Sequence, residues 1–407
     1  MDQIHLMQLI EINDVKGVSL FHETARIIYK GDSNWVAPLR VEIENTFTPK
    51  TNNCFRDGSA IRWVLTDDSG QLIGRVAAFI NHAKNKKINF PMGGLGFFEC
   101  VNNQEAADIL FDACREWLSE RGARGMDGSI NFGENMVNWG VLVEGFMPQS
   151  YGMPYNKSYY GELFEKYGFR DFFQQYSYHK DLKEPFPERI VKFAHYLETR
   201  PGYTFEHFTL KNQKKYVNDL IGILNATWAT YMEGFTPIDA GEIDVLFKSA
   251  KPLIEEDFIW FAYKDGRPIG VVVCLPDFNQ VLNHFNGRIG FLQVPKFLYL
   301  KKKKTINRFR VLLAGIVPEY QNSGTIAALF LQMVKALETK PQYKEMEMSW
   351  VGDFNERMIK IYEQIGGVRK KRHITYRIFF DSKIPFERFT NAGGDSKLRK
   401  DAIKNHN

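Results

Sequence analysis

The sequence contains few cysteines, no long apolar run and no targeting segment. Its four cysteines, Cys54, Cys100, Cys114 and Cys274, are scattered without C-x-x-C spacing, which argues against a zinc site and against a disulfide framework. No stretch approaches the ~20 apolar residues that a membrane-spanning helix needs. The first residues include acids early and lack a basic region followed by a cleavage site. We therefore expect an enzyme of a reducing, cytoplasmic compartment.

The chain also carries little net charge for its size. A formal charge of +5 over 407 residues argues against a dedicated nucleic-acid partner. Hydrophobic residues make up 44% and charged residues 25%, as in soluble globular proteins, and the length predicts two or three domains. Aromatic residues reach 14%. We expect some of them to line a groove.

The most informative stretch lies at residues 308–380. Arg310 to Ile316 is short, apolar and rich in β-branched residues, which predicts a buried strand. A compact turn, Gln321 to Gly324, follows. Apolar residues then recur with helical spacing on one face, at Ile326, Leu329, Phe330, Met333 and Leu337. A strand that leads through a small turn into a helix N-terminus presents backbone N–H groups, and such a place receives a phosphate or pyrophosphate.

The next segment repeats this strand–turn–helix succession. Apolar and polar residues alternate from Glu345 to Trp350, which predicts a strand with two different faces. A turn at 351–355 leads into a helix over 356–364 that ends at Gly366 and Gly367.

Segments 198 residues apart also resemble each other. Phe164 to Phe169 matches Tyr362 to Gly367, because 362 − 164 = 198. The segment QQYSYHKDL follows the first and RHITYRIFF the second, and WVLTDDSGQLIGRVAAF pairs with WFAYKDGRPIGVVVCL. Three matches in the same order indicate a tandem duplication. The alternative is two unrelated α/β domains.

Together these motifs resemble the GNAT superfamily of acyl-CoA-dependent N-acyltransferases. The turn after the fourth GNAT strand usually reads Q/R-x-x-G-x-G/A; Gln321 and Gly324 match, whereas Ile326 replaces the small third residue. Tyr362 fits the tyrosine that protonates the leaving thiolate. GFFECVNNQEAADILFDACREWLSERG, GSINFGENMVNWGVLVEGF, MPYNKSYYGELFEKYGF, SWVGDFNERM and LPDFN further resemble a bacterial group of tandem-GNAT proteins, mostly uncharacterised. The resemblance implies α/β mixed sheets with flanking helices in two tandem GNAT-like domains, and acyl transfer.

The domain organisation follows from the repeat. We expect an N-terminal GNAT-like domain at 1–182, a linker at 183–202, a C-terminal domain with the acyl-CoA site at 203–381, and a tail at 382–407. Two acids, Glu99 and Glu105, stand where a pyrophosphate would approach the first domain. The first domain is therefore predicted to lack a cofactor. Residues 213–250 are predicted to form two helices at the acceptor-binding position of the superfamily.

The chemistry needs an oxyanion site, an acid and a base. We expect Tyr362 to be the acid, and Glu347 and Asp353 are the candidates for the base, although residues at such positions are more often solvated side chains of a strand face or a turn. The predicted residues that contact acetyl-CoA or another acyl-CoA are Leu313, Ala314, Gly315, Ile316, Gln321, Asn322, Ser323, Gly324, Thr325 and Asn355. The predicted residues that contact the acceptor are Asn131, Glu134, Asn135, Tyr155, Asn156 and Tyr159.

Four consecutive lysines, Lys301 to Lys304, follow an apolar and aromatic strip at 291–300. This run is either a solvated loop or a peripheral contact with an anionic membrane. The first interpretation of the whole chain is an acetyl-CoA-dependent N-acyltransferase. A second is a transferase of long acyl or aminoacyl groups to a lipid or cell-wall amine, and a third is a non-catalytic ligand-binding protein. The oligomeric state does not follow from the sequence.

Overall fold

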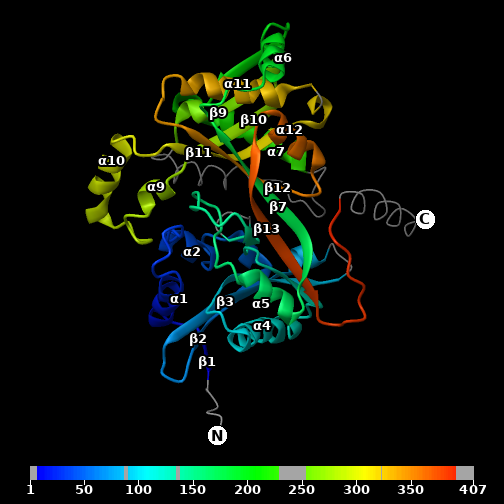
Figure 1. Ribbon diagram of the computed structural model, residues 1–407. Helices are drawn as coiled ribbons and strands as arrows, with labels where there is room; N and C mark the ends of the chain where they lie inside the picture. Colours follow the sequence, from blue (N-terminus) through cyan, green and yellow to red (C-terminus); the bar gives the residue numbers. More distant parts are fainter. Residues whose placement is uncertain (1–6, 87–89, 134–137, 229–253, 322, 391–407) are drawn as a thin grey trace, which may run out of the picture.

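The computed structural model describes residues 7–86, 90–133, 138–228, 254–321 and 323–390, and these residues build one continuous mixed sheet of thirteen strands. Twelve of them follow the order β1-β2-β3-β4-β5-β13-β7-β12-β11-β10-β9-β8, and β6 also pairs with β13. The long strands β7 and β13 run side by side between the two ends of the molecule (Figure 1). We call β1 to β5 with β13 the N-terminal half-sheet, and β8 to β12 with β7 the C-terminal half-sheet.

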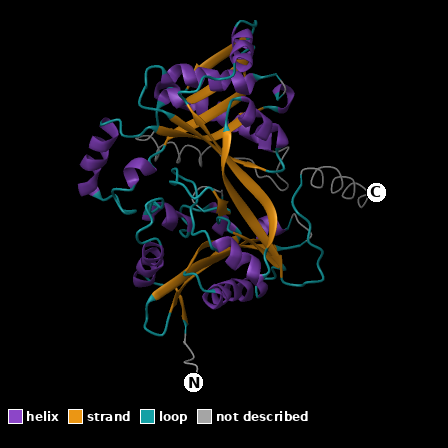
Figure 2. Ribbon diagram, in the orientation of Figure 1, coloured by secondary structure: helices purple, strands orange, loops and turns teal. Residues whose placement is uncertain are grey.

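Helices and strands alternate along both halves of the chain (Figure 2). The first half contains β1 (Gln8–Glu11), α1 (Val15–Ile28), α2 (Arg40–Thr46), β2 (Gly58–Thr66), β3 (Leu72–Asn81), α3 (His82–Asn85), β4 (Met92–Cys100), α4 (Gln104–Ser119), β5 (Gly125–Gly128), β6 (Val141–Glu144), α5 (Tyr160–Tyr167) and β7 (Arg170–Asp181). The second half contains α6 (Glu188–Glu198), β8 (Tyr203–His207), α7 (Gln213–Trp228), β9 (Ile259–Lys264), β10 (Arg267–Pro276), α9 (Asn279–Leu282), α10 (Val294–Lys302), β11 (Arg308–Ile316), α11 (Thr325–Leu337), β12 (Glu345–Gly352), α12 (Glu356–Gln364) and β13 (Val368–Phe379).

The predicted duplication is visible in the two last strands. Strand β13 begins 368 − 170 = 198 residues after β7, and it ends 379 − 181 = 198 residues after it. Their antiparallel pairing is symmetric, because Val368 opposes His179 and Arg377 opposes Arg170, which are the same two repeat positions exchanged. The order of the sheet is consequently the same when read inward from either end. These features confirm two tandem GNAT-like repeats.

The two repeats exchange their last strands, which the sequence did not predict. Strand β13 pairs with β5 of the first repeat, and β7 pairs with β12 of the second. Both α5 and α12 are followed by a glycine with positive φ, Gly168 at 109° and Gly366 at 85°, where the chain turns into its long strand. A glycine reaches this conformation without a steric cost. Each half-sheet is thus completed by the other half of the chain.

Alternating apolar side chains let the sheet bury both of its faces. In β2, Trp63 and Leu65 pack in one core cluster with α4 and α5, whereas Val64 packs in another with Phe21 of α1. This is the period of two expected of a strand. In the second half, α7 lies on one face, where Gly315 adjoins Ile223, and α11 lies on the other.

Several expectations about the second half need qualification. Helix α6 lies in the predicted linker, but it packs on α11 through Ala194, Leu197, Ala328 and Leu331. The lysine run was expected to be a loop, but its first two residues, Lys301 and Lys302, belong to helix α10. The second helix expected within 213–250 lies outside the described residues. The domain boundaries themselves stay a prediction. In the described part of the chain, no helix has the length and apolarity needed to cross a membrane.

Candidate active site

Strand β11 parts from its neighbour β12 halfway along its length. The two strands pair in parallel only from Arg308 to Val311 and from Glu345 to Met348. Beyond Val311, β11 follows β10 up to Ile316, and no described strand pairs with its other side. Leu312, Leu313 and Ala314 are half-buried there, in contrast to the buried start of the strand. The structure therefore has a strand edge without a paired strand at 312–316, called the open edge, which includes the predicted Leu313, Ala314, Gly315 and Ile316. At its end, the Ile316 carbonyl accepts from Thr227 at 3.3 Å and from Gln321 at 3.4 Å.

The N-terminus of α11 stands at the end of this open edge. Gly324 is its N-cap residue with φ +74°, and no side chain caps the helix. Ser323 and Thr325 hydrogen-bond each other through their hydroxyl groups at 2.6 Å. The side chain of Gln321 accepts a hydrogen bond from Arg357. Asn322 lies outside the described residues. The loop thus leaves the helix dipole without a charged cap, although the Thr325 amide donates to the Ser323 hydroxyl group at 3.4 Å and the Ala327 amide donates to the Gly324 carbonyl at 3.0 Å.

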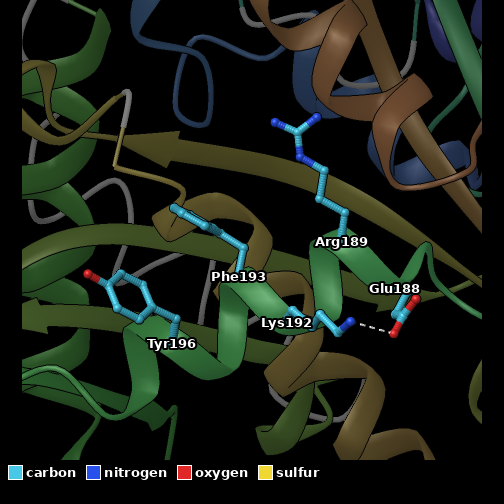
Figure 3. A pocket seen from close by; sticks show the side chains of 5 residues that line it. All are labelled: Glu188, Arg189, Lys192, Phe193 and Tyr196. Atoms are coloured by element: carbon cyan, nitrogen blue, oxygen red, sulfur yellow. Dashed lines mark ion pairs between the residues drawn. The ribbon is translucent and has the colours of Figure 1, made fainter.

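Helix α6 covers one side of this loop. The ring of Phe193 occupies the space that a Cβ atom on Gly324 would need. Around Phe193 lies a depression of about 420 Å³ lined by Glu188, Arg189, Lys192, Phe193 and Tyr196. Figure 3 shows these five side chains on one helix, with Lys192 paired to Glu188 at 2.6 Å. Of these five residues, Phe193 adjoins the predicted pyrophosphate loop at Gly324, and Arg189 and Lys192 lie on the same helix within four residues of it.

Tyr362 lies in the core beside the point where β11 and β12 part. It is 4% exposed and packs on the ring of Tyr178 with centroids 5.6 Å apart. Burial raises its pKa, and the neighbouring Cys274 raises it further while Arg310 lowers it. No hydrogen bond to its hydroxyl group occurs among the described residues. The phenol is therefore neutral at pH 7 and has a proton to donate. The predicted Asn355 accepts a hydrogen bond from the Met358 amide as the N-cap of α12.

The equivalent place in the N-terminal half-sheet is closed. Strands β4 and β5 also pair over four residues, up to Leu95 and Gly128, and then separate. The Cys100 amide donates to the Tyr160 hydroxyl at 2.9 Å, and the Tyr159 hydroxyl donates to the Cys100 carbonyl at 2.8 Å. From Gly93 to Cys100 every residue of β4 is buried. Two tyrosine side chains therefore bond the backbone at the end of β4, and the whole unpaired part of this strand is buried, in contrast to the half-buried residues 312–314 of β11.

The N-terminus of α4, the helix after β4, also differs from that of α11. The side chain of Asn103 caps α4 by accepting from the Ala106 amide at 3.1 Å. Glu99 is buried and paired with Arg75 at 3.3 Å, and burial raises its pKa. The sequence suggested that Glu99 faces the position of a pyrophosphate. In the structure it is instead buried against Arg75. Glu105 lies in the first turn of α4.

A buried ionic cluster lies where the two half-sheets meet. Glu347 of β12 is 0% exposed; its carboxylate lies 3.1 Å from the Lys371 ammonium and 3.0 Å from Nε2 of His179, and it accepts a hydrogen bond of 2.5 Å from Ser150. Burial alone would raise its pKa, but Lys371 and His179 hold it well below the usual range. Arg310 lies opposite Glu347 in the ladder, and burial lowers its pKa to about 10. The cluster joins residues of both repeats on one face of the sheet.

The other predicted residues form contacts within the chain. Asp353 pairs with Arg388 at 2.7 Å. Tyr155 donates to Asp32, Asn156 bridges the amide and carbonyl groups of Leu142, and Tyr159 closes β4 as described. Asn131 follows β5, whereas Glu134 and Asn135 lie outside the described residues. The structure thus does not bring these acceptor candidates together at the open edge, and their roles stay predictions.

Sequence reasoning missed the cationic pair on α6 and most of the buried cluster. Lys371 lies between Lys370 and Arg372, and His179 is followed by Lys180, so the sequence marks neither side chain as buried. Their proximity to Glu347 was not predictable either, because it depends on the exchange of β7 and β13. Arg189 and Lys192 were overlooked because α6 was assigned to a linker.

A duplicated sheet with splayed central strands is the fold of solved tandem GNAT proteins. A tandem GNAT protein from the clavulanic acid biosynthesis pathway superposes with a TM-score of 0.57 at 10% identity, covering 94% of this chain and 100% of that one. A GCN5-related N-acetyltransferase from Sphaerobacter thermophilus gives a TM-score of 0.52 at 11% identity, with 94% and 98% covered.

Sequence comparison identifies closer relatives. A bacterial ceramide synthase of Caulobacter vibrioides is 30% identical over 356 residues, which cover 86% of this chain and 90% of that protein. Protein YghO of Escherichia coli is 27% identical over 376 residues, covering 89% and 92%. No family model matches the sequence. The chain belongs to the family of tandem GNAT proteins that contains this bacterial ceramide synthase.

Proposed function

We propose that the protein is an N-acyltransferase that moves an acyl group from acyl-CoA to the amine of a long-chain lipid. The observation that carries the proposal is the open edge of β11 at 312–316, which ends at the N-terminus of α11, where the N-cap residue is a glycine and no charged side chain caps the helix. A thioester carbonyl needs backbone N–H donors, and a pyrophosphate needs a helix N-terminus. In the C-terminal half-sheet, the unpaired edge of β11 and the N-terminus of α11 follow each other along the chain. In the N-terminal half-sheet, Tyr159 and Tyr160 bond the backbone of Cys100 at the corresponding end of β4.

The residues present fit an acyl-CoA in this position. In the proposal, the amides that begin α11 hold the pyrophosphate, and Arg189 and Lys192 face the remaining phosphate charge. The half-buried Leu312, Leu313 and Ala314 line the path of the acyl-bearing arm. Coenzyme A supplies the activated thioester; the protein supplies orientation, an oxyanion site and a proton.

The reaction forms an amide bond and breaks the carbon–sulfur bond. The nitrogen lone pair of the acceptor attacks the carbonyl carbon, whose oxygen is stabilised by backbone N–H groups of the open edge. Collapse of the tetrahedral adduct releases the thiolate, and the Tyr362 hydroxyl group donates its proton to sulfur. Glu347 has a lowered pKa, so it is a weak base. In this proposal the acceptor loses its proton to solvent at the edge, and Glu347 positions the strands.

The lipid acceptor is favoured over a small amine by the ceramide synthase relative. A ceramide is the amide of a fatty acid with a long-chain amino alcohol. A protein that is 30% identical to such an enzyme over most of its length is expected to act on an acceptor of the same chemical class. Acetyl transfer to a soluble amine, the first expectation from the sequence, is the competing outcome of the test.

The test measures amide formation by mass spectrometry. Purified protein is incubated with acetyl-CoA or palmitoyl-CoA, and with sphinganine or ethanolamine as the acceptor. We expect an N-palmitoyl product on sphinganine and release of one free thiol per amide. Tyr362→Phe should lower this rate on the order of 10²-fold with little change in the affinity for CoA. Palmitoyl transfer at the wild-type rate by Tyr362→Phe would remove Tyr362 from the mechanism, and absence of any amide would contradict the proposal.

A further inference from the structure

The segment at 288–304, between β10 and β11, exposes apolar side chains that a folded protein ordinarily buries. Phe291 is 91% exposed and Leu292 is 85% exposed, and Leu298 and Tyr299 are each more than half exposed. We call this segment the basic tip. Helix α10, which forms most of it, projects from the side of the molecule together with α9 (Figure 1). Contiguous exposed apolar side chains of this kind mark an interaction surface.

The tip is held in place from within. Phe297, on the inner side of α10, is buried and lies near Phe278 and Phe285, with ring centroids 6.5 and 6.3 Å away. At its neck, the side chain of Gln280 exchanges two hydrogen bonds of 2.8 Å with Asn307. Because one face of α10 is anchored, the other face is presented outward in a defined orientation.

The charge of the tip has a single sign. Residues 288–304 contain six basic side chains and neither Asp nor Glu; the basic residues are Arg288, Lys296, Lys301, Lys302, Lys303 and Lys304. Two ammonium groups lie over aromatic rings, that of Lys303 4.8 Å from the Tyr299 ring centre and that of Lys296 5.3 Å from the Phe285 ring centre. An apolar and aromatic face rimmed by lysines is the composition of a helix that lies in the interface of an anionic membrane.

We infer that the basic tip docks the protein on an anionic lipid surface, with Phe291 and Leu292 inserted and the lysines at the headgroups. An acidic protein would satisfy the lysines, but it would not account for two neighbouring side chains that project almost fully into solvent.

The base of the tip leads toward the candidate active site. Asp277, which precedes α9, pairs with Arg308 of β11 at 2.7 Å, and both side chains are buried. Asp277 also accepts from the Tyr151 amide at 2.8 Å, and the Tyr151 carbonyl accepts from Arg310 at 2.7 Å. A small cavity of about 20 Å³ lies here, with Leu282 and Asn279 of α9 in its wall. The base of the tip is therefore joined through buried polar contacts to the start of β11, the strand that carries the candidate active site. The docking itself does not depend on which reaction the protein catalyses.

Co-sedimentation of the full chain with vesicles tests the inference. One set of vesicles contains phosphatidylglycerol and the other only phosphatidylcholine. We compare wild type with F291S/L292S, with a variant in which Lys301 to Lys304 are Ser, and with the matched control V15S/V41S. Val15 and Val41 are 84% and 62% exposed on α1 and α2, outside the tip, although the amide of Arg40, next to Val41, donates to the Gly287 carbonyl just before the tip. Unchanged thermal unfolding establishes that each variant is folded.

We expect wild type and V15S/V41S to pellet with the anionic vesicles. Each lysine strengthens binding about fivefold, so the four-lysine variant should bind at least an order of magnitude more weakly, and F291S/L292S similarly. Binding should fade as the Debye length shrinks from ~10 Å at 0.1 M to ~3 Å at 1 M salt. Failure of wild type to pellet at low salt would overturn the inference and point to a protein partner. Equal pelleting of the tip variants and wild type would place the membrane contact elsewhere.

Discussion

Removal of the Glu347 carboxylate is the perturbation whose effect the structure defines most fully. In Glu347→Gln, the Lys371 ammonium remains buried, with a 3% exposed side chain, and loses the carboxylate at 3.1 Å. Breaking a buried ion pair by removing one partner costs about 3–5 kcal/mol, because the remaining charge is left without compensation. We expect a loss of this size in the free energy of unfolding. Lys371→Met should be similarly destabilised, since it leaves Glu347 charged.

The double variant E347Q/K371M separates the ion pair from the rest of the cluster. It removes both charges of the pair, so it should be more stable than the sum of the two single losses predicts, by about 1–3 kcal/mol. The assay is urea unfolding followed by circular dichroism, with unchanged m-values as the sign that all variants fold alike. A loss below about 1 kcal/mol in Glu347→Gln would refute the argument, since exposed ion pairs give such values.

The pH dependence supplies an independent check. The folded pKa of Glu347 lies well below the unfolded value of 4.5. The ion pair therefore contributes its full stability above pH 4.5, and this contribution falls by about 1.4 kcal/mol per pH unit below it, until the folded pKa is reached. Glu347→Gln should lose less stability than wild type between pH 4.5 and more acidic solutions. Parallel pH profiles for the two proteins would show that Glu347 is not held as a buried anion.

Two further predictions concern the loop and the exchanged strands. Gly324→Ala should weaken binding of CoA by about tenfold in calorimetry, because residue 324 has φ +74° and its new Cβ atom would meet the Phe193 ring. The control is Gly222→Ala, where a Cβ atom meets nothing within 4 Å. Equal affinities of the two variants for CoA would contradict the assignment of the loop. A fragment of residues 1–182 lacks β13, so it should dimerise through its own β7 or precipitate, because the edge of β5 is uncovered; a stable monomer in light scattering would contradict this.

The local features of the fold were accessible from the sequence. The alternation in β12 and the helical stripe of α11 depend on neighbouring residues, so these two elements were predicted with their faces. The offset of 198 residues predicted the duplication, and β7 and β13 follow it at both ends. The exchange of these strands was not predictable, because either strand could complete either half-sheet with the same pattern of side chains.

The site was accessible only in part, for the same physical reason. The turn from Gln321 to Gly324 predicts a helix N-terminus from neighbouring residues alone. In the structure, this N-terminus follows the open edge of β11. Whether a tyrosine or a carboxylate can contact a substrate depends on its hydrogen-bond partners within the protein, and these partners are distant in sequence. Tyr159 closes β4, Asn156 holds Leu142, and Glu347 is surrounded by donors from β7 and β13. The assigned roles of these side chains stay predictions.

A crystal structure with a non-hydrolysable palmitoyl-CoA analogue tests the central claim most directly. We expect one analogue per chain. Its pyrophosphate should lie at the N-terminus of α11, its carbonyl at the β11 edge between Leu312 and Ile316, and its sulfur beside the Tyr362 hydroxyl group. An analogue bound between β4 and β5, where Tyr159 and Tyr160 now lie, would contradict the account.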